Sequence, residues 1–169
     1  MRKFLNRALK KIGKLDIDQI RSLIMDVVQE NELLEMVLYS MTDGVVVLDE
    51  KQNVILLNKA AERLFPFKSG EVAERPLWDA LADSSLSAFF HEALVGQENI
   101  EDKEISLESG GVTRILSCTM MPLVRDGRIQ GGLLHIEDIT EKKGKEARLR
   151  RAENLASLTT LTAGVAHEI

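Results

Sequence analysis

The chain has 169 residues and a net charge of −5, with 44% hydrophobic and 29% charged residues, which is ordinary for a soluble protein. This length suits one domain of about 100–150 residues with flanking segments. Its longest apolar runs, such as Val45–Leu48, have four residues, whereas a membrane span needs about 20. The start lacks the apolar stretch of a secretory signal, so we expect a cytoplasmic location.

Basic charge is concentrated at the start of the chain. Residues 1–14 carry six basic side chains and no acidic one, with apolar residues between them. Two interpretations are open for this segment: contact with an anionic membrane surface, or a solvated terminus. The rest of the chain is acidic and poor in aromatic residues, which argues against binding to nucleic acid.

Residues 15–41 have the spacing of a coiled-coil helix, because apolar residues recur at alternating intervals of three and four. The series is Ile17, Ile20, Ile24, Val27, Asn31, Leu34, Leu38 and Met41. Asn31 interrupts it, and a buried asparagine there would fix the register of a two-stranded coil. Further apolar residues widen this face. The helix is therefore expected either to pair with a second copy in a homodimer or to cover its own domain.

Residues 42–140 predict an α+β domain with a five-stranded antiparallel sheet and helices on one face. Two β-rich runs around a polar turn, Gly44–Asp49 and Val54–Asn58, predict a hairpin. Helices are expected at residues 59–65, 76–81 and 84–95, with Asn58 capping the first and Gly96 ending the last. Three further strands are expected at residues 103–107, 112–123 and 129–137, with glycine-containing turns between them.

Residues 141–169 predict a long helix with a second coiled-coil seam. The seam residues are Leu155, Leu158, Thr162, Val165 and Ile169. His167 is two residues from Val165 and from Ile169, which is about 200° around a helix, so its imidazole should face away from the seam. An exposed imidazole that titrates near neutral pH can attack a phosphoryl group.

Two parts of the chain resemble known families. The segments Asp43–Asp49, Asn58–Phe65 and Asp138–Thr140 resemble a PAS domain, although Pro66 stands where that pattern usually has glycine. Leu158–Ile169 is similar to the start of the H-box in the dimerisation and phosphotransfer helix of sensor histidine kinases. The H-box normally continues with Lys, Arg or Asn and then Asn-Pro-Leu, and this chain stops before that continuation.

The resemblance implies the sensory and dimerisation part of a sensor histidine kinase in a two-component system. It makes His167 the phosphoacceptor and Glu168 its acid–base neighbour, and it gives Asp138 and Thr140 a role in signal relay. ATP and Mg²⁺ would bind a separate catalytic domain, so this chain should be inactive alone. The implied partners are a second copy, that catalytic domain and a cognate response regulator. The alternative is a non-enzymatic dimerisation or ligand-binding module of a regulator with another output.

The sequence does not identify a ligand or a metal for the PAS-like domain. His91 lies in the helix where haem-binding relatives place an iron ligand, but its aromatic neighbours favour a core or surface histidine. Cys118 is expected to be a buried thiol in a strand, whereas flavin photochemistry in this superfamily uses an Asn-Cys pair in a helix. His135 is expected on a sheet face, and Trp78 is expected to pack in the core.

Overall fold

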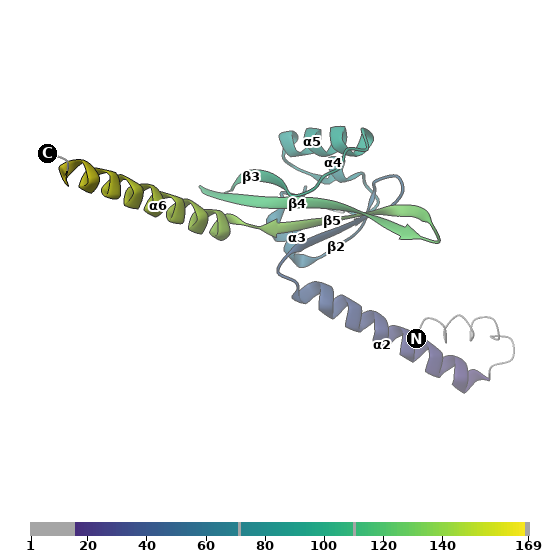
Figure 1. Cartoon of the computed structure of the whole chain (residues 1–169). Coiled ribbons are helices and arrows are strands. Elements are labelled where there is room, and N and C mark those ends of the chain that lie inside the picture. Colours follow the sequence, from purple (N-terminus) through teal and green to yellow (C-terminus); the bar gives the residue numbers. More distant parts are fainter. Residues whose placement is uncertain (1–15, 71, 110, 168–169) are drawn as a thin grey trace. The chain divides into compact units, whose positions relative to one another are not determined.

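The computed structural model describes residues 16–70, 72–109 and 111–167 (Figure 1). They form two compact units, one ending at Met41 and the other beginning at Thr42. The described part of the first unit is a single helix, α2 (Ile17–Ser40). It starts with a reciprocal capping box, in which Asp16 accepts a hydrogen bond from the Gln19 amide at 2.8 Å and the Gln19 side chain accepts one from the Asp16 amide.

Taken by itself, α2 exposes the apolar series that the sequence predicts for a coiled-coil seam. Ile17, Ile24 and Leu34 are all more than half exposed. Asn31 is also exposed, and its side-chain amide donates a hydrogen bond of 2.9 Å to Glu35, one helical turn further on. The helix therefore carries apolar surface that its own fold does not bury.

The second unit contains five antiparallel strands, as the sequence predicts. They are β1 (Gly44–Leu48), β2 (Val54–Leu57), β3 (Lys103–Ser109), β4 (Val112–Arg125) and β5 (Arg128–Asp138). Their order in the sheet is β2-β1-β5-β4-β3. The first and last strands of the chain are thus central neighbours, and β2 and β3 form the two edges.

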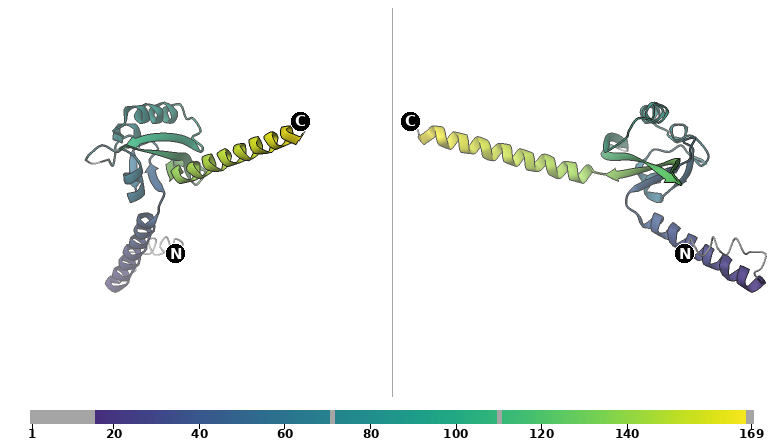
Figure 2. Two further views of the ribbon diagram at one scale, coloured as in Figure 1. Left: turned by 90° about the vertical axis from the view of Figure 1, so that its left-hand side faces the viewer. Right: turned by 45° about the vertical axis from the view of Figure 1, so that its right-hand side comes forward.

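Helices cover one face of this sheet, because the side chains that the register brings together on that face are apolar. Val46 pairs with Leu134 and Cys118 pairs with Ile136, and all four are buried. The helices are α3 (Lys59–Leu64), α4 (Leu77–Ala80) and α5 (Ser84–Val95). The core is made of Val46, Leu48, Val54, Ala61, Phe65, Leu77, Ala80, Leu81, Leu86, Phe90, Ala93, Ile100, Leu116, Cys118, Leu134 and Ile136. Figure 2 shows this layer from two further directions.

Asn58 caps α3 as predicted, and it also holds that helix against the sheet. Its side-chain oxygen accepts hydrogen bonds from the amides of Ala61 at 2.9 Å and Val45 at 3.0 Å. Its side-chain nitrogen donates to the carbonyl of Asp43 at 2.9 Å. Asn58 is the one buried polar residue of the described core, and its hydrogen bonds compensate for its burial.

The last two strands are longer than the sequence predicts, because they continue to a tight two-residue turn. Asp126 and Gly127 both have positive φ, 51° and 74°, as in the turns that suit the twist of a hairpin. The β4–β5 register shifts by one residue between the Leu123–Gly131 pair and the Val124–Ile129 pair, as at a β-bulge. The helix α6 (Thr140–His167) follows β5 directly.

Gly131 lies in β5 next to the end of β1, where the backbone conformation and the space both require glycine. Its φ is +143°, and a Cβ atom there would lie 1.9 Å from the carbonyl oxygen of Leu48.

We expect Gly131→Ala to lower the free energy of unfolding by about 2 kcal/mol or more, measured by urea denaturation. Gly144→Ala in α6 is the control, because no neighbouring atom lies within 4 Å. The control should be neutral or stabilising by up to about 1 kcal/mol. Equal midpoints for Gly131→Ala and the unchanged protein would contradict this account.

Candidate functional site

The junction between β5 and α6 is held by Thr140. Its hydroxyl oxygen accepts a hydrogen bond from the amide of Ile115 in β4 at 2.9 Å, and its hydroxyl donates to the Asp138 carboxylate at 2.5 Å. Asp138 also accepts from the Thr140 amide at 3.0 Å. Ile139 between them is 5% exposed, and its amide donates to the Ile115 carbonyl at 2.9 Å. The start of α6 is therefore fixed to β4 near the start of that strand.

A second contact joins the first turn of α6 to the edge strand β3. The Lys143 ammonium lies 2.5 Å from a carboxylate oxygen of Glu104. The hydrogen bond that Lys143 donates to Glu104 raises the pKa of Lys143 above its usual value. This pair is open to solvent, so its main contribution is to position the helix rather than to stabilise the fold.

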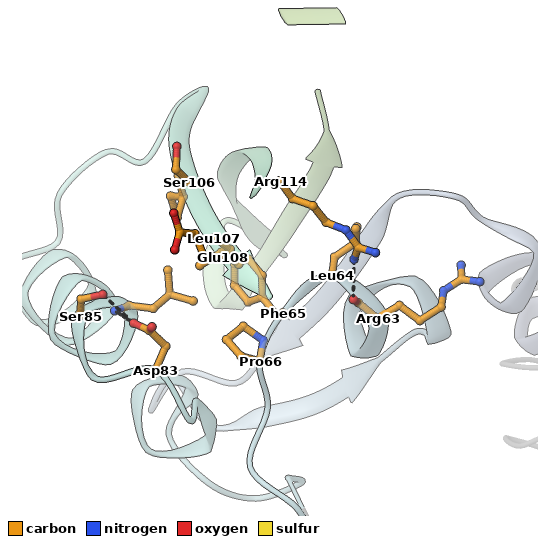
Figure 3. A pocket seen from close by; sticks show the side chains of 12 residues that line it. Arg63, Leu64, Phe65, Pro66, Asp83, Ser85, Ser106, Leu107, Glu108 and Arg114 are labelled. Carbon is orange, nitrogen blue, oxygen red and sulfur yellow. Dashed lines mark hydrogen bonds between the residues drawn. The ribbon is translucent and has the colours of Figure 1, made fainter. Parts of the chain in front are cut away.

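A cavity of about 430 Å³ lies between the end of α3, the start of α5 and the strands β3 and β4. Its apolar wall contains Phe65, Leu86, Ile105 and Leu107. Arg114 reaches across from β4 and donates a hydrogen bond of 3.2 Å to the carbonyl of Arg63, the penultimate residue of α3. Figure 3 shows this contact on one side of the cavity.

Asp83 lies on the other side of the cavity, beside Ser85 (Figure 3). It caps α5, because one carboxylate oxygen accepts from the Ser85 hydroxyl at 2.6 Å and from the Leu86 amide at 2.8 Å. The Ser85 hydrogen bond, followed by that of the Leu86 amide, lowers the pKa of Asp83. This carboxylate is therefore ionised at neutral pH and engaged with its own helix.

Other residues singled out from the sequence lie apart from this cavity. Cys118 is buried as predicted, and burial raises its pKa to about 12, which keeps the thiol protonated and unreactive. His91 is exposed on α5, where its ring meets the half-buried Trp78 edge-on at 5.1 Å. His135 faces the sheet surface as predicted, and its Nε2 lies 3.0 Å from an Asp43 carboxylate oxygen.

The predicted phosphotransfer residues are at the limit of what the structure describes. The backbone of α6 extends to His167, but the side chains of residues 156–167 and all of Glu168 lie outside the described part, as does the basic segment 1–14. Among the described residues, no cluster of three His, Cys, Asp or Glu side chains could hold a metal ion. None of the described helices has the length and apolar character needed to cross a bilayer.

The fold and the matched residues together define the family. A model described as the PAS fold matches residues 38–144, so the chain belongs to the PAS fold family. It is also 30% identical over 141 residues to the signal transduction histidine-protein kinase AtoS of Escherichia coli (strain K12), covering 81% of this chain and 23% of AtoS. Sporulation kinase E of Bacillus subtilis (strain 168) is 30% identical over 129 residues, which cover 75% of this chain and 17% of that kinase.

Solved structures of other proteins have the same fold at low sequence identity. The PAS domain of Bordetella pertussis BvgS matches with a TM-score of 0.53 and 19% identity, over 75% of this chain and 98% of that one. A phage VqmA–DPO complex matches with a TM-score of 0.54 and 20% identity, over 75% of this chain and 60% of that one. The chain spans less than a quarter of either kinase relative.

Sequence analysis did not find Arg114, Lys143 or the contact of His135 with Asp43. Arg114 and the Arg63 carbonyl are 51 residues apart in sequence, and His135 and Asp43 are 92 residues apart. Local patterns cannot place such pairs, because each depends on which strands are neighbours. The one available signal for Arg114 was an arginine inside a strand segment otherwise rich in apolar residues.

Replacing Thr140 tests whether its hydroxyl holds α6 to the sheet. Thr140→Val removes the acceptor of the Ile115 amide and the donor to Asp138, so we expect a loss of about 1–2 kcal/mol in the free energy of unfolding. Amide hydrogen exchange at Ile115 should accelerate about tenfold. Thr113→Val is the matched control on an exposed position of β4. Equal exchange at Ile115 in both variants would show that the Thr140 hydroxyl does not hold the junction.

Proposed function

We propose that this chain is the sensory and dimerisation part of a sensor histidine kinase. In this proposal, the PAS domain receives a cue and α6 transmits it to His167, which accepts phosphate from ATP bound to a separate catalytic domain. The phosphate then passes to a cognate response regulator. ATP and response regulators are cytoplasmic, so the proposal implies a cytoplasmic location for this part of the protein.

One observation supports this proposal most strongly. A single helix runs from the last strand of the PAS domain to His167 without interruption. At about 1.5 Å per residue, α6 can carry a displacement of its first turn over roughly 40 Å. The similarity to two kinases covers both the PAS domain and most of this chain, which agrees with such a connection.

The contacts at the start of α6 suggest how a cue could reach the helix. Thr140 bonds to β4, and Lys143 pairs with Glu104 on β3, so the first turn rests on two strands that also line the cavity. A small displacement of these strands would shift or rotate α6. Such a change selects between two packings of a helix pair, which is a common form of switching.

Phosphorylation of His167 is the direct test. In a fusion to a histidine-kinase catalytic domain with ATP and Mg²⁺, we expect acid-labile phosphate on this chain, as is typical of a nitrogen–phosphorus bond. His167→Gln should abolish the label, and Glu168→Gln should slow it by about 10²–10⁴-fold if Glu168 assists proton transfer. Phosphate is measured by radiolabelling, and helix content by circular dichroism.

His91→Gln provides the matched control, because His91 is an exposed histidine on α5. This variant should be labelled as fully as the unchanged protein. Full labelling of His167→Gln would place the acceptor elsewhere. Loss of helix content in His167→Gln would instead give this residue a structural role.

We also propose that the chain forms a parallel homodimer through α2 and α6. The support is the exposed apolar series of α2, which a partner helix would bury. Asn31→Leu should then raise the melting temperature, because it removes an amide from the seam, and it should loosen the choice of oligomer. Gln29→Leu, outside the series, is the control for added apolar surface on the same helix.

Light scattering at tens of micromolar and thermal melts measure these effects. A monomeric chain would exclude the dimer. A strict dimer with an unchanged melting temperature for Asn31→Leu would place Asn31 outside the contact.

The alternative is a non-enzymatic PAS module that controls another output domain. The residues that follow Ile169 in the full-length protein distinguish the two proposals. An Asn-Pro-Leu continuation and an ATP-binding domain favour the kinase. A DNA-binding or cyclase domain favours the alternative.

A further inference from the structure

Two arginines, Arg63 and Arg114, line the cavity beside α3 and α5, and Figure 3 shows the Arg63 side chain pointing away from the apolar wall. Arg114 pairs with Leu107 across β4 and β3, so both side chains lie on the face of the sheet that the helices cover. Leu107 belongs to the apolar wall, together with Phe65 and Leu86. Among the described residues, Arg114 forms no ion pair, and its one hydrogen bond goes to a backbone carbonyl.

The acidic residues around the cavity do not neutralise Arg114. Glu108 also lines the cavity, but it pairs with Thr113 across the strands, and among the described residues it forms no ion pair with Arg114. Asp83 is engaged in capping α5 and lies on the far side of the cavity (Figure 3). The Arg114 guanidinium therefore has further N–H groups that can donate hydrogen bonds to a ligand, and apolar side chains line the same cavity.

We propose that this cavity binds a small organic carboxylate with an apolar body. The Arg114 guanidinium holds the carboxylate through its remaining N–H groups, which match the geometry of two carboxylate oxygens. The apolar body packs on Phe65, Leu86, Ile105 and Leu107. A volume of about 430 Å³ lies within the range of small-molecule sites.

A monocarboxylate fits this site better than a phosphorylated ligand or a sugar. A phosphate group carries close to two negative charges, whereas the Arg63 side chain points away from the cavity and leaves only the Arg114 guanidinium for the ligand. A sugar would leave many hydroxyl groups without partners on that wall. The inference builds on the proposed sensory function, because it names the kind of cue that the domain receives.

Ligand binding in the cavity would change the position of α6 through the residues next to the ligand. Arg114 precedes Ile115, whose backbone bonds to Ile139 and Thr140. Ile105 follows Glu104, which pairs with Lys143. A carboxylate drawn to Arg114 therefore acts on the two strands that hold the first turn of the helix.

Calorimetric titration of the 169-residue chain with 4-methylpentanoate tests the proposal. Hexanoate and phenylacetate vary the apolar body, 4-methylpentanamide keeps the shape without the charge, and acetate keeps the charge without the body. We expect saturable binding of the three larger carboxylates, with the amide and acetate each at least about tenfold weaker. Charge-assisted hydrogen bonds and apolar burial each contribute enough for that difference.

Variants locate the site. Arg114→Gln should weaken the binding of 4-methylpentanoate about 10–100-fold and leave the binding of the amide unchanged. Arg114→Lys should have an intermediate affinity for 4-methylpentanoate, because lysine keeps the charge but lacks the paired N–H groups of the guanidinium. Arg125→Gln, an exposed arginine near the end of the same strand, should bind like the unchanged chain. Amide exchange at Ile139–Lys143 should slow on binding in the unchanged chain.

The result that overturns the proposal is absence of saturable binding for all three larger carboxylates up to about 10 mM. Equal binding of the amide, or equal weakening by Arg125→Gln, overturns it as well. These titrations need no catalytic domain, so a negative outcome leaves the phosphorylation of His167 to its own test. Conversely, an unphosphorylated His167 would not affect the binding data.

Discussion

The hydrogen bonds of Asn58 are the constraint on which the arrangement of the PAS domain depends. One buried side chain joins two segments: the chain at the start of β1, through Asp43 and Val45, and the start of α3, through Ala61. Loss of this amide would leave buried N–H groups without acceptors, at about 1–3 kcal/mol each. Since α3 forms one side of the cavity, the same contacts also set where Arg63 and Arg114 meet.

The relation between cavity and output follows from the sheet order. The strands β3 and β4 carry the cavity wall on one face and hold α6 through adjacent residues, so binding and transmission share the same backbone. The contacts to α6 are few and partly exposed, and the residues that make them are not members of the domain core. A junction of this kind can change position without unfolding the sensor, because its opening costs much less than global unfolding.

Local sequence patterns predicted most elements, whereas long-range pairing had to come from the structure. The helix at residues 84–95 matches its predicted bounds: Gly96 ends it as expected, and the structure adds Asp83 as the cap at its start. The structure extends β4 to Arg125 and begins β5 at Arg128, beyond the predicted residues 123 and 129. The reason is that the turn between the two strands needs only Asp126 and Gly127. The cavity escaped prediction for a different reason: it needs Arg114 opposite Leu107 and next to the end of α3, and no local pattern reveals either pairing.

The central position of β1 and β5 has a consequence for how such domains are combined. Gly44, at the start of β1, pairs directly with Ile136, near the end of β5, so the chain enters and leaves the domain at neighbouring points. A segment with adjacent ends can be inserted or exchanged as a cassette with little effect on the rest of a longer protein. Chimaeras joined at residues 43 and 138 would therefore keep their downstream helix in phase while changing what the protein senses.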